Sequence, residues 1–348
     1  MNSAGAVAAA AARAEATALL DRLTKPKGAL GRLEPLAVRL AGIERRCPPA
    51  PWPGAIAVFA ADHGVVASGV TPWPQEVTAQ MVANIAGGGA AISVLARQHG
   101  LRLVVVDVGV VARFDPTDTL WVHKVRPGSA DLAVGPALSP TDVDAAIVVG
   151  SDVASRLVSG GARCLLTGEM GIGNTTSAAA VIAALTGASP RECVGRGTGI
   201  DDAMLAHKVS IVVRALARLP KGARPATVLA EVGGLEIAAL AGYIGTAAKA
   251  GVPVLLDGVI TLAGACAAEA FWPGTVQSCI AGHRSVEPGA SVALAHLGLE
   301  PVLDLEMRLG EGSGAATAYP LLVSAARLLG EMATFDGAGV TEKDQTTR

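Results

Sequence analysis

The chain has 348 residues, of which 51% are hydrophobic, and its 28 Lys and Arg nearly balance its 30 Asp and Glu. A near-neutral chain without a basic stripe argues against a nucleic-acid-binding or membrane-surface protein. Only 3% of the residues are aromatic, so Ala, Val, Leu and Gly must fill the core and helices must lie close to strands. The composition favours a small-molecule function on one large domain or two smaller ones.

The N-terminal stretch MNSAGAVAAAAARAEATALLDRL lacks a basic start and is interrupted by Arg13, Glu15, Asp21 and Arg22. It therefore predicts an amphipathic helix rather than a secretory signal. The five cysteines are scattered, without a CxxC pair or a Cys/His cluster, and predict neither a disulfide framework nor a metal site. We expect a cytoplasmic protein whose cysteines are core residues.

Short apolar runs alternate with helical stretches along the chain. The predicted strands are 55–61, 101–108, 163–167, 226–232, 252–258 and 276–282, and the predicted helices between them include 77–99, 175–186, 202–218, 236–250 and 260–269. Continuous apolar runs are typical of strands covered on both faces. The alternation predicts an α/β fold with a doubly wound, mainly parallel six-stranded Rossmann-like sheet.

The two flanks of the chain, 1–45 and 300–348, are helical in character, and we expect them to form a small domain beside a large α/β domain of 46–299. Ligands of doubly wound sheets bind beyond the carboxyl ends of the strands. Polar residues and glycines follow the predicted strands at those ends, at 62–64, 168–171, 233–234, 257–258 and 282–285. This clustering places the expected active site there.

GEMGIGNTT (168–176) joins a strand to a small-residue helix. Free amides at a helix start favour an anion, so Gly171, Gly173, Asn174, Thr175 and Thr176 predict a phosphate site. No Lys precedes the two threonines, which argues against a Walker loop and for a monophosphate. The alternative is a tight turn capped by Asn174 or Thr175.

GRGTGIDD (195–202) is a second flexible turn. Gly197 and Thr198 tolerate an anion, and either Asp201 or Asp202 is expected to cap the next helix. Lys208 lies one to two turns into that helix, where its ammonium reaches a phosphate as a point charge. The alternative is a solvated lysine on a helix surface.

Two further stretches carry polar groups with competing interpretations. Asp62 and His63 end the first predicted strand and either act in catalysis or anchor the loop. Gln80, in the following helix, is a candidate to face a heterocycle. In RLGEGSGAA (308–316), Glu311 lies between glycines ahead of a helix. It is either a general base, if partly desolvated, or an acid favoured by the helix dipole.

Seven motifs then occur together in a characteristic order: LTKPKGALGRLE, DHG, PQEVTAQMV, TGEMGIGNTTSAAA, GRGTGIDD, GHRSVEPG and RLGEGSGAA. In this combination the chain resembles the nicotinate-nucleotide–dimethylbenzimidazole phosphoribosyltransferases over nearly its whole length. Ala29, where Ser is expected, and the glycine-rich 86–89 are small departures. The resemblance implies transfer of a phosphoribosyl group from nicotinate mononucleotide to dimethylbenzimidazole, with inversion at C1′, by a homodimer that needs no metal or cofactor.

The resemblance also implies roles for individual residues. Glu311 is the general base and Glu169 a supporting active-site acid. Gly197, Thr198 and Lys208 hold the phosphate, and Ser285 approaches the nicotinate carboxylate. Gln80 and Leu309 border the benzimidazole. With the phosphate on the amides of 171–176, we expect Glu169 to point away from that turn, towards the ribose or the cationic ring.

Two other functions remain open from the sequence. A nicotinamide-dependent oxidoreductase suits the sheet, although the glycine turn follows a middle strand and no acid is placed to read a dinucleotide ribose. A non-catalytic nucleotide or azole binder needs the pocket but not Glu311. The preferred acceptor base is not determined, because one methyl group changes binding by only about 1–3 kcal/mol.

Overall fold

The computed structural model describes residues 3–197 and 199–341, and one six-stranded sheet forms its centre. The strands are β1 Gly54–Ala61, β2 Arg102–Gly109, β3 Leu120–Val122, β4 Cys164–Met170, β5 Val254–Leu256 and β6 Cys279–Ala281. All pairs of neighbours are parallel, and the order is β3-β2-β1-β4-β5-β6. The predicted doubly wound fold is confirmed, with its change of direction between β1 and β4.

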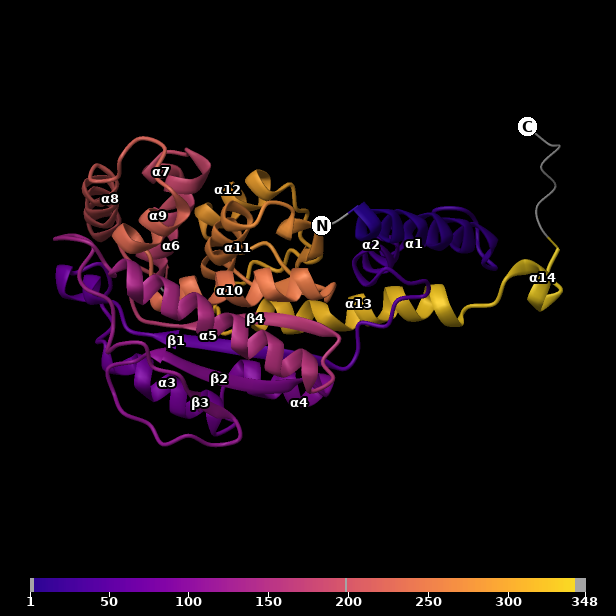
Figure 1. Cartoon of the computed structure of the whole chain (residues 1–348), viewed down its shortest axis with the longest axis horizontal. Helices are drawn as coiled ribbons and strands as arrows, with labels where there is room; N and C mark the ends of the chain where they lie inside the picture. Colours follow the sequence, from indigo (N-terminus) through magenta and orange to yellow (C-terminus); the bar gives the residue numbers. More distant parts are fainter. Residues whose placement is uncertain (1–2, 198, 342–348) are drawn as a thin grey trace.

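Helices cover both faces of the sheet (Figure 1). One face packs against α3 Glu76–Ala86, α4 Ala91–His99 and α13 Ser313–Glu331. On the other face, α10 Leu235–Ala250 and α11 Val259–Phe271 contact the strands. The same core continues into α5 Pro140–Ser159, α6 Asn174–Thr186, α8 Asp202–Leu216, α9 Pro225–Val232 and α12 Pro288–Leu297, with the short α7 Pro190–Cys193 beside them. Along β1, Ile56 and Val58 face the first layer while Ala57 and Phe59 face the second. Burial on both faces explains the continuous apolar strands.

Small residues permit the close helix packing that the composition predicted. A Cβ on Gly150 of α5 would lie 1.8 Å from the Ala239 carbonyl oxygen of α10. A Cβ on Gly242 of α10 would lie 2.0 Å from the Ile147 carbonyl oxygen of α5. The two helices therefore touch through their backbones, which leaves little room for aromatic side chains at this contact.

Three details of the predicted elements are wrong. Residues 226–232 form helix α9, because Pro225 starts a helix that buries Val228, Leu229 and Val232 on one side. The sixth strand is instead β3, three residues at the sheet edge and too short to give a pattern. The predicted helix 77–99 is divided into α3 and α4 by the glycines at 87–89.

The remaining helices gather at one end of the molecule (Figure 1). They are α1 Ser3–Arg22, α2 Leu33–Glu44 and α14 Phe335–Ala338. Ala12, Ala16 and Leu20 of α1 are buried with Leu329, near the end of α13. The N-terminal helix is thus confirmed. The first half of α13 belongs to the sheet core, so this helix links the terminal cluster to the sheet.

The segment Glu76–His99 is long and apolar enough to cross a membrane by length and composition, with 33% of its window buried. In the fold it is not one helix but α3 and α4, separated by a glycine turn. Two 3₁₀ turns complete the description, at Gly64–Ser68 and Thr275–Ser278. The first follows β1 and the second precedes β6.

Candidate active site

A cavity of about 380 Å³ opens beyond the carboxyl ends of β4, β5 and β6. Its lining comes from α3, the turn after β4, the loops after β5 and β6, and the segment before α13. The lining residues are Trp73, Val77, Met81, Glu169, Met170, Gly171, Ile172, Asn174, Thr175, Gly197, Gly258, Val259, Ile260, His283, Ser285, Glu287, Arg308, Leu309, Gly310 and Glu311. Five of the stretches singled out in the sequence contribute to it: 168–176, 195–202, 257–258, 282–285 and 308–316.

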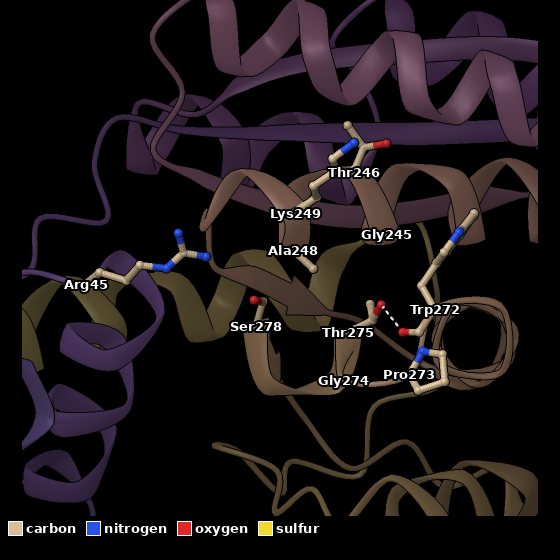
Figure 2. Close-up of a pocket in the computed structure, with 10 residues that line it drawn as sticks. All are labelled: Arg45, Gly245, Thr246, Ala248, Lys249, Trp272, Pro273, Gly274, Thr275 and Ser278. Atoms are coloured by element: carbon tan, nitrogen blue, oxygen red, sulfur yellow. Dashed lines mark hydrogen bonds between the residues drawn. The ribbon is translucent and has the colours of Figure 1, made fainter. Parts of the chain in front are cut away.

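A larger cavity, of about 700 Å³, lies at the opposite ends of the strands. Figure 2 shows its lining, which includes Arg45 after α2, Lys249 near the end of α10 and Trp272 after α11. Ser278, directly before β6, places this cavity at the amino ends of the strands. None of its described lining residues carries a carboxylate. Ligands of doubly wound sheets bind instead at the carboxyl ends of the strands. The smaller cavity is therefore the candidate active site.

Glu311 occupies a left-handed turn at the cavity wall. Its φ is 63°, between Gly310 at 82° and Gly312 at 92°. A residue with a side chain adopts this conformation at a cost of about 1–2 kcal/mol, a kind of strain that clusters at functional sites. The side chain is buried, and its Oε2 has no hydrogen-bond partner among the described residues. Burial raises the pKa of Glu311, and the charge of Asp257 adds to this rise while the Ile92 amide opposes it.

Glu169, at the end of β4, is the second carboxyl group in the cavity and is also buried. Burial, followed by the charge of Asp257, raises its pKa to about 8. The side-chain amide of Asn174 donates a hydrogen bond to Glu169 Oε2. The Oε1 atom of Glu169 lies on the other side, where a Cβ on Gly310 would be 2.4 Å from it. Glu169 therefore lies between the start of α6 and the segment of Glu311, and its expected direction towards the ribose or the cationic ring stays a prediction.

The glycine turn itself is packed tightly against the end of β1. A Cβ on Gly171 would lie 2.4 Å from the Ala61 carbonyl oxygen. Gly173, at φ 91°, is the N-cap of α6, so the expected cap at Asn174 or Thr175 is one to two residues too late. Gly173 and the buried Thr176 shape the turn but do not line the cavity. Gly171, Asn174 and Thr175 line it as expected.

Lys208 connects the two glycine turns. It is 2% exposed, so the alternative of a solvated lysine is wrong. Its Nζ donates to Thr175 Oγ1 at 2.8 Å and to the Gly195 carbonyl at 3.2 Å. Burial lowers the pKa of Lys208 to about 8. The expected cap of α8 is Asp201, whose carboxylate accepts from the Met204 amide.

Gly197 lines the cavity, whereas Thr198 lies outside the described residues. The Gly197 amide donates to Glu287 Oε1 at 2.8 Å, and its carbonyl accepts from Arg308 Nη1 at 3.3 Å. Sequence reasoning assigned no role to Glu287 or Arg308, although both lie in the motifs GHRSVEPG and RLGEGSGAA. Arg308 places a guanidinium at the cavity beside the predicted phosphate turns.

Asp62 and His63 do not line the cavity. Asp62 Oδ2 accepts from the Val111 amide at 2.7 Å, and His63 Nε2 lies 2.8 Å from Glu236 Oε1, with both side chains of that pair fully buried. Burial opposes protonation of His63, but the charges of Glu236 and Asp62 outweigh it and raise the pKa of His63. These contacts match the interpretation that the pair anchors the loop.

The remaining expected residues differ in whether they line the cavity. Ser285 and the half-exposed Leu309 line the cavity. Gln80 lies on the exposed side of α3 and does not line it, so its expected contact with a ligand needs correction. The helical repeat instead directs Val77 and Met81, four residues apart, into the cavity. Polar character suggested Gln80, but the face of the helix decides the contact.

The chain matches a family model described as phosphoribosyltransferase over residues 6–340. This match and the doubly wound sheet define its class. Curated relatives named nicotinate-nucleotide–dimethylbenzimidazole phosphoribosyltransferase include proteins from Salinispora tropica and Thermus thermophilus. The first is 53% identical, covering 95% of this chain and 96% of the relative, and the second 50% identical, covering 94% and 98%.

A crystal structure of CobT from Thermus thermophilus is similar at a TM-score of 0.94 and 49% identity, covering 96% of this chain and 100% of that one. The chain belongs to the family of nicotinate-nucleotide–dimethylbenzimidazole phosphoribosyltransferases. The resemblance drawn from the motifs is thus confirmed.

Proposed function

We propose that this enzyme transfers the phosphoribosyl group of nicotinate mononucleotide to 5,6-dimethylbenzimidazole. The products are nicotinate and α-ribazole 5′-phosphate, which supplies the lower ligand of cobalamin. The names of the relatives support the substrates. The single observation that carries the mechanism is the buried Glu311 oxygen without a partner among the described residues, held at the wall of the cavity.

The chemistry requires one base and no further activation of the leaving group. The pyridinium nitrogen of the donor is already cationic, so nicotinate leaves without protonation. A benzimidazole nitrogen attacks C1′ from the opposite face, which converts the β-linkage to α. Its second nitrogen loses a proton, which the Glu311 carboxylate accepts, and the same charge stabilises the cation that develops on the ring.

Glu169 complements this base. With a pKa of about 8, its carboxyl group keeps its proton at neutral pH. We assign the ionised form to Glu311, so that one carboxylate and one neutral acid share the cavity, the arrangement in which neighbouring carboxyl groups take different roles. We assign Glu169 a supporting role next to the ribose, positioned by Asn174.

For the donor, we assign the 5′-phosphate to the region between the two glycine turns. The walls of this region are formed by Gly171, Asn174, Thr175 and Gly197. Gly173 and Thr176 shape the first turn, and we also assign Thr198 to phosphate binding. Lys208 and Arg308 supply positive charge. Ser285 binds the nicotinate carboxylate.

The acceptor is assigned to the apolar wall of the cavity. Val77, Met81 and Leu309 border the benzimidazole, with Trp73 from the loop before α3 also in the cavity wall. This apolar wall suits a flat, methylated heterocycle.

We further propose a cytoplasmic homodimer that uses neither metal nor cofactor. All five cysteines are free thiols, as suits a reducing compartment. We also propose the division into a small helical domain of 1–45 with 300–348 and a large domain of 46–299. The separate core of Ala12, Leu20 and Leu329 supports it, while α13 extends across both parts.

The test is to mix the purified protein with nicotinate mononucleotide and dimethylbenzimidazole, without metal, and to separate the products by chromatography. Matched formation of nicotinate and α-ribazole phosphate is expected. A protein that binds the nucleotide but forms neither product would contradict the assigned acceptor. Bound NAD detected by absorbance would favour an oxidoreductase instead, and turnover that survives Glu311→Ala would remove the assigned base.

A further inference from the structure

We infer that Asp257 is a positioning residue whose carboxylate holds the left-handed turn of Gly310–Gly312 so that Glu311 faces the cavity. Asp257 directly follows β5 and is 1% exposed. The sequence places it at a strand end but gives it no partner. The inference deepens the proposed function and rests on it where turnover is concerned.

The carboxylate binds three backbone amides at the start of α13. Oδ2 accepts from Gly312 at 3.1 Å, and Oδ1 accepts from Gly314 at 2.7 Å and Ala315 at 3.0 Å. These amides belong to the helix terminus, where no intrahelical acceptor exists and the dipole favours an anion. Because Glu311 directly precedes Gly312, fixing that amide fixes the Glu311 backbone.

Asp257 is itself held from two sides. Its own amide donates to Thr167 Oγ1 of β4 at 3.1 Å, and His283 Nε2 lies 3.4 Å from its Oδ1. A Cβ on Gly314 would lie 2.0 Å from the His283 ring, so the ring rests directly on the first turn of α13. The turn with Glu311 is thus fixed to β4, β5 and the loop after β6. This support balances the cost of its left-handed backbone.

The same carboxylate sets the electrostatic surroundings of the base. The titratable and charged side chains around Glu311 are Glu169 from β4, Asp257 from β5, His283 and Glu287 from the loop after β6, and Arg308 from its own segment. The start of α4 contributes the uncharged Ile92 amide. The negative charge of Asp257 makes ionisation of both Glu311 and Glu169 harder. Removing it should lower both pKa values.

The experiment compares Asp257→Asn with wild type in turnover and in hydrogen–deuterium exchange. We expect kcat to fall at least about 30-fold, KM for both substrates to stay within about threefold, and the acid limb of the kcat–pH profile to move to lower pH. Exchange should rise in 310–316 and little elsewhere. Thr167→Val, which removes the acceptor of the Asp257 amide, should change kcat and exchange in the same direction but more weakly. It replaces Asp257→Asn in the test if that variant does not fold.

Asp107→Asn is the matched control, because Asp107 is equally buried at the end of β2 and accepts from the Val110 amide outside the cavity. Asp107→Asn should leave both the acid limb of the kcat–pH profile and the hydrogen–deuterium exchange in 310–316 unchanged. An Asp257→Asn enzyme with unchanged kcat and unchanged exchange would overturn the inference. So would a uniform rise in exchange without a shifted limb. A wild type without turnover, together with a local rise in exchange, would refute the proposed function and leave the positioning role supported.

Discussion

Two acids framed by glycines, in GEMG (168–171) and GEGSG (310–314), lie in the same cavity but in different states. Each precedes a helix whose N-cap is a left-handed glycine, Gly173 at 91° and Gly312 at 92°. Glu169 belongs to a strand and binds Asn174. Glu311 itself adopts a left-handed backbone and keeps one oxygen without a partner in the described part of the chain.

The difference shows how one local pattern serves two purposes. Glu169 lies near the end of a strand of the core, and its bond to Asn174 ties it to the glycine turn before α6. Glu311 lies outside regular structure. Its turn is held by Asp257, which accepts from the Gly312 amide, and by Ser313, whose hydroxyl donates to the Gly310 carbonyl at 2.7 Å. A carboxylate with an unused oxygen is ready to accept a proton, whereas a protonated, hydrogen-bonded carboxyl group is better suited to orientation.

The largest expected effect is on kcat, which should fall further when Glu311 is replaced than when Glu169 is replaced. Glu311→Ala should lower kcat by about 10²- to 10⁴-fold, because general base catalysis typically contributes that much, while nucleotide binding is kept. Glu169→Gln should lower kcat less. Glu306→Ala is a matched control, since Glu306 is exposed but shares the left-handed backbone at φ 56°. Equal losses for Glu169→Gln and Glu311→Ala, measured by steady-state kinetics, would break the comparison.

Lys208, which we assign to the phosphate site beside Glu169, should affect the KM for the nucleotide. Lys208→Met keeps the buried volume but removes the ammonium next to Thr175. We expect KM for the nucleotide to rise about 10- to 100-fold, the equivalent of a charged hydrogen bond of about 1.5–3 kcal/mol, with a smaller change in kcat. Lys249→Met, at the exposed lysine of the other cavity, should change neither. An unaltered KM in Lys208→Met would remove this residue from the phosphate site.

The raised pKa of Glu169 predicts how stability depends on pH. The folded protein keeps this proton up to about pH 8, whereas the unfolded chain releases it near 4.5. Its contribution is therefore present below about pH 4.5 and is lost as the pH rises through 8, by up to about 1.4 kcal/mol per unit. Thermal unfolding from pH 5 to 8 should show a steeper fall for wild type than for Glu169→Gln. Parallel curves would mean that Glu169 is already ionised in the folded state.

The smallest expected effect concerns the apolar wall of the cavity. Met81→Ala should raise KM for dimethylbenzimidazole by about three- to tenfold, since each buried methylene is worth about 0.8 kcal/mol. Gln80→Ala, one residue earlier on the exposed side of α3, should leave it unchanged. The reverse ranking in steady-state kinetics would show that the helix face is turned differently in the bound enzyme.

The sequence by itself determined the class of fold and the composition of the site. Buried parallel strands need continuous apolar runs, and chemical groups follow strand ends, so both leave local signals such as GEMG and GEGSG. Lys208 and Glu311 were singled out from their local patterns, whereas Ser285 and Leu309 were assigned through the family resemblance. Each of the four lines the cavity or bonds to a residue that does. The short edge strand β3 and the helix α9 were missed because brief apolar runs do not distinguish strand from helix.

Tertiary structure alone decided how these residues are used. Asp257 and the start of α13 are more than 50 residues apart in the sequence, yet their hydrogen bonds hold the turn that carries Glu311. Asn174 turns Glu169 towards α6, and the orientation of α3 selects Met81 over Gln80. Such contacts depend on how separate elements are packed, and no local pattern encodes them, because burial and partner geometry set both the protonation and the direction of a side chain.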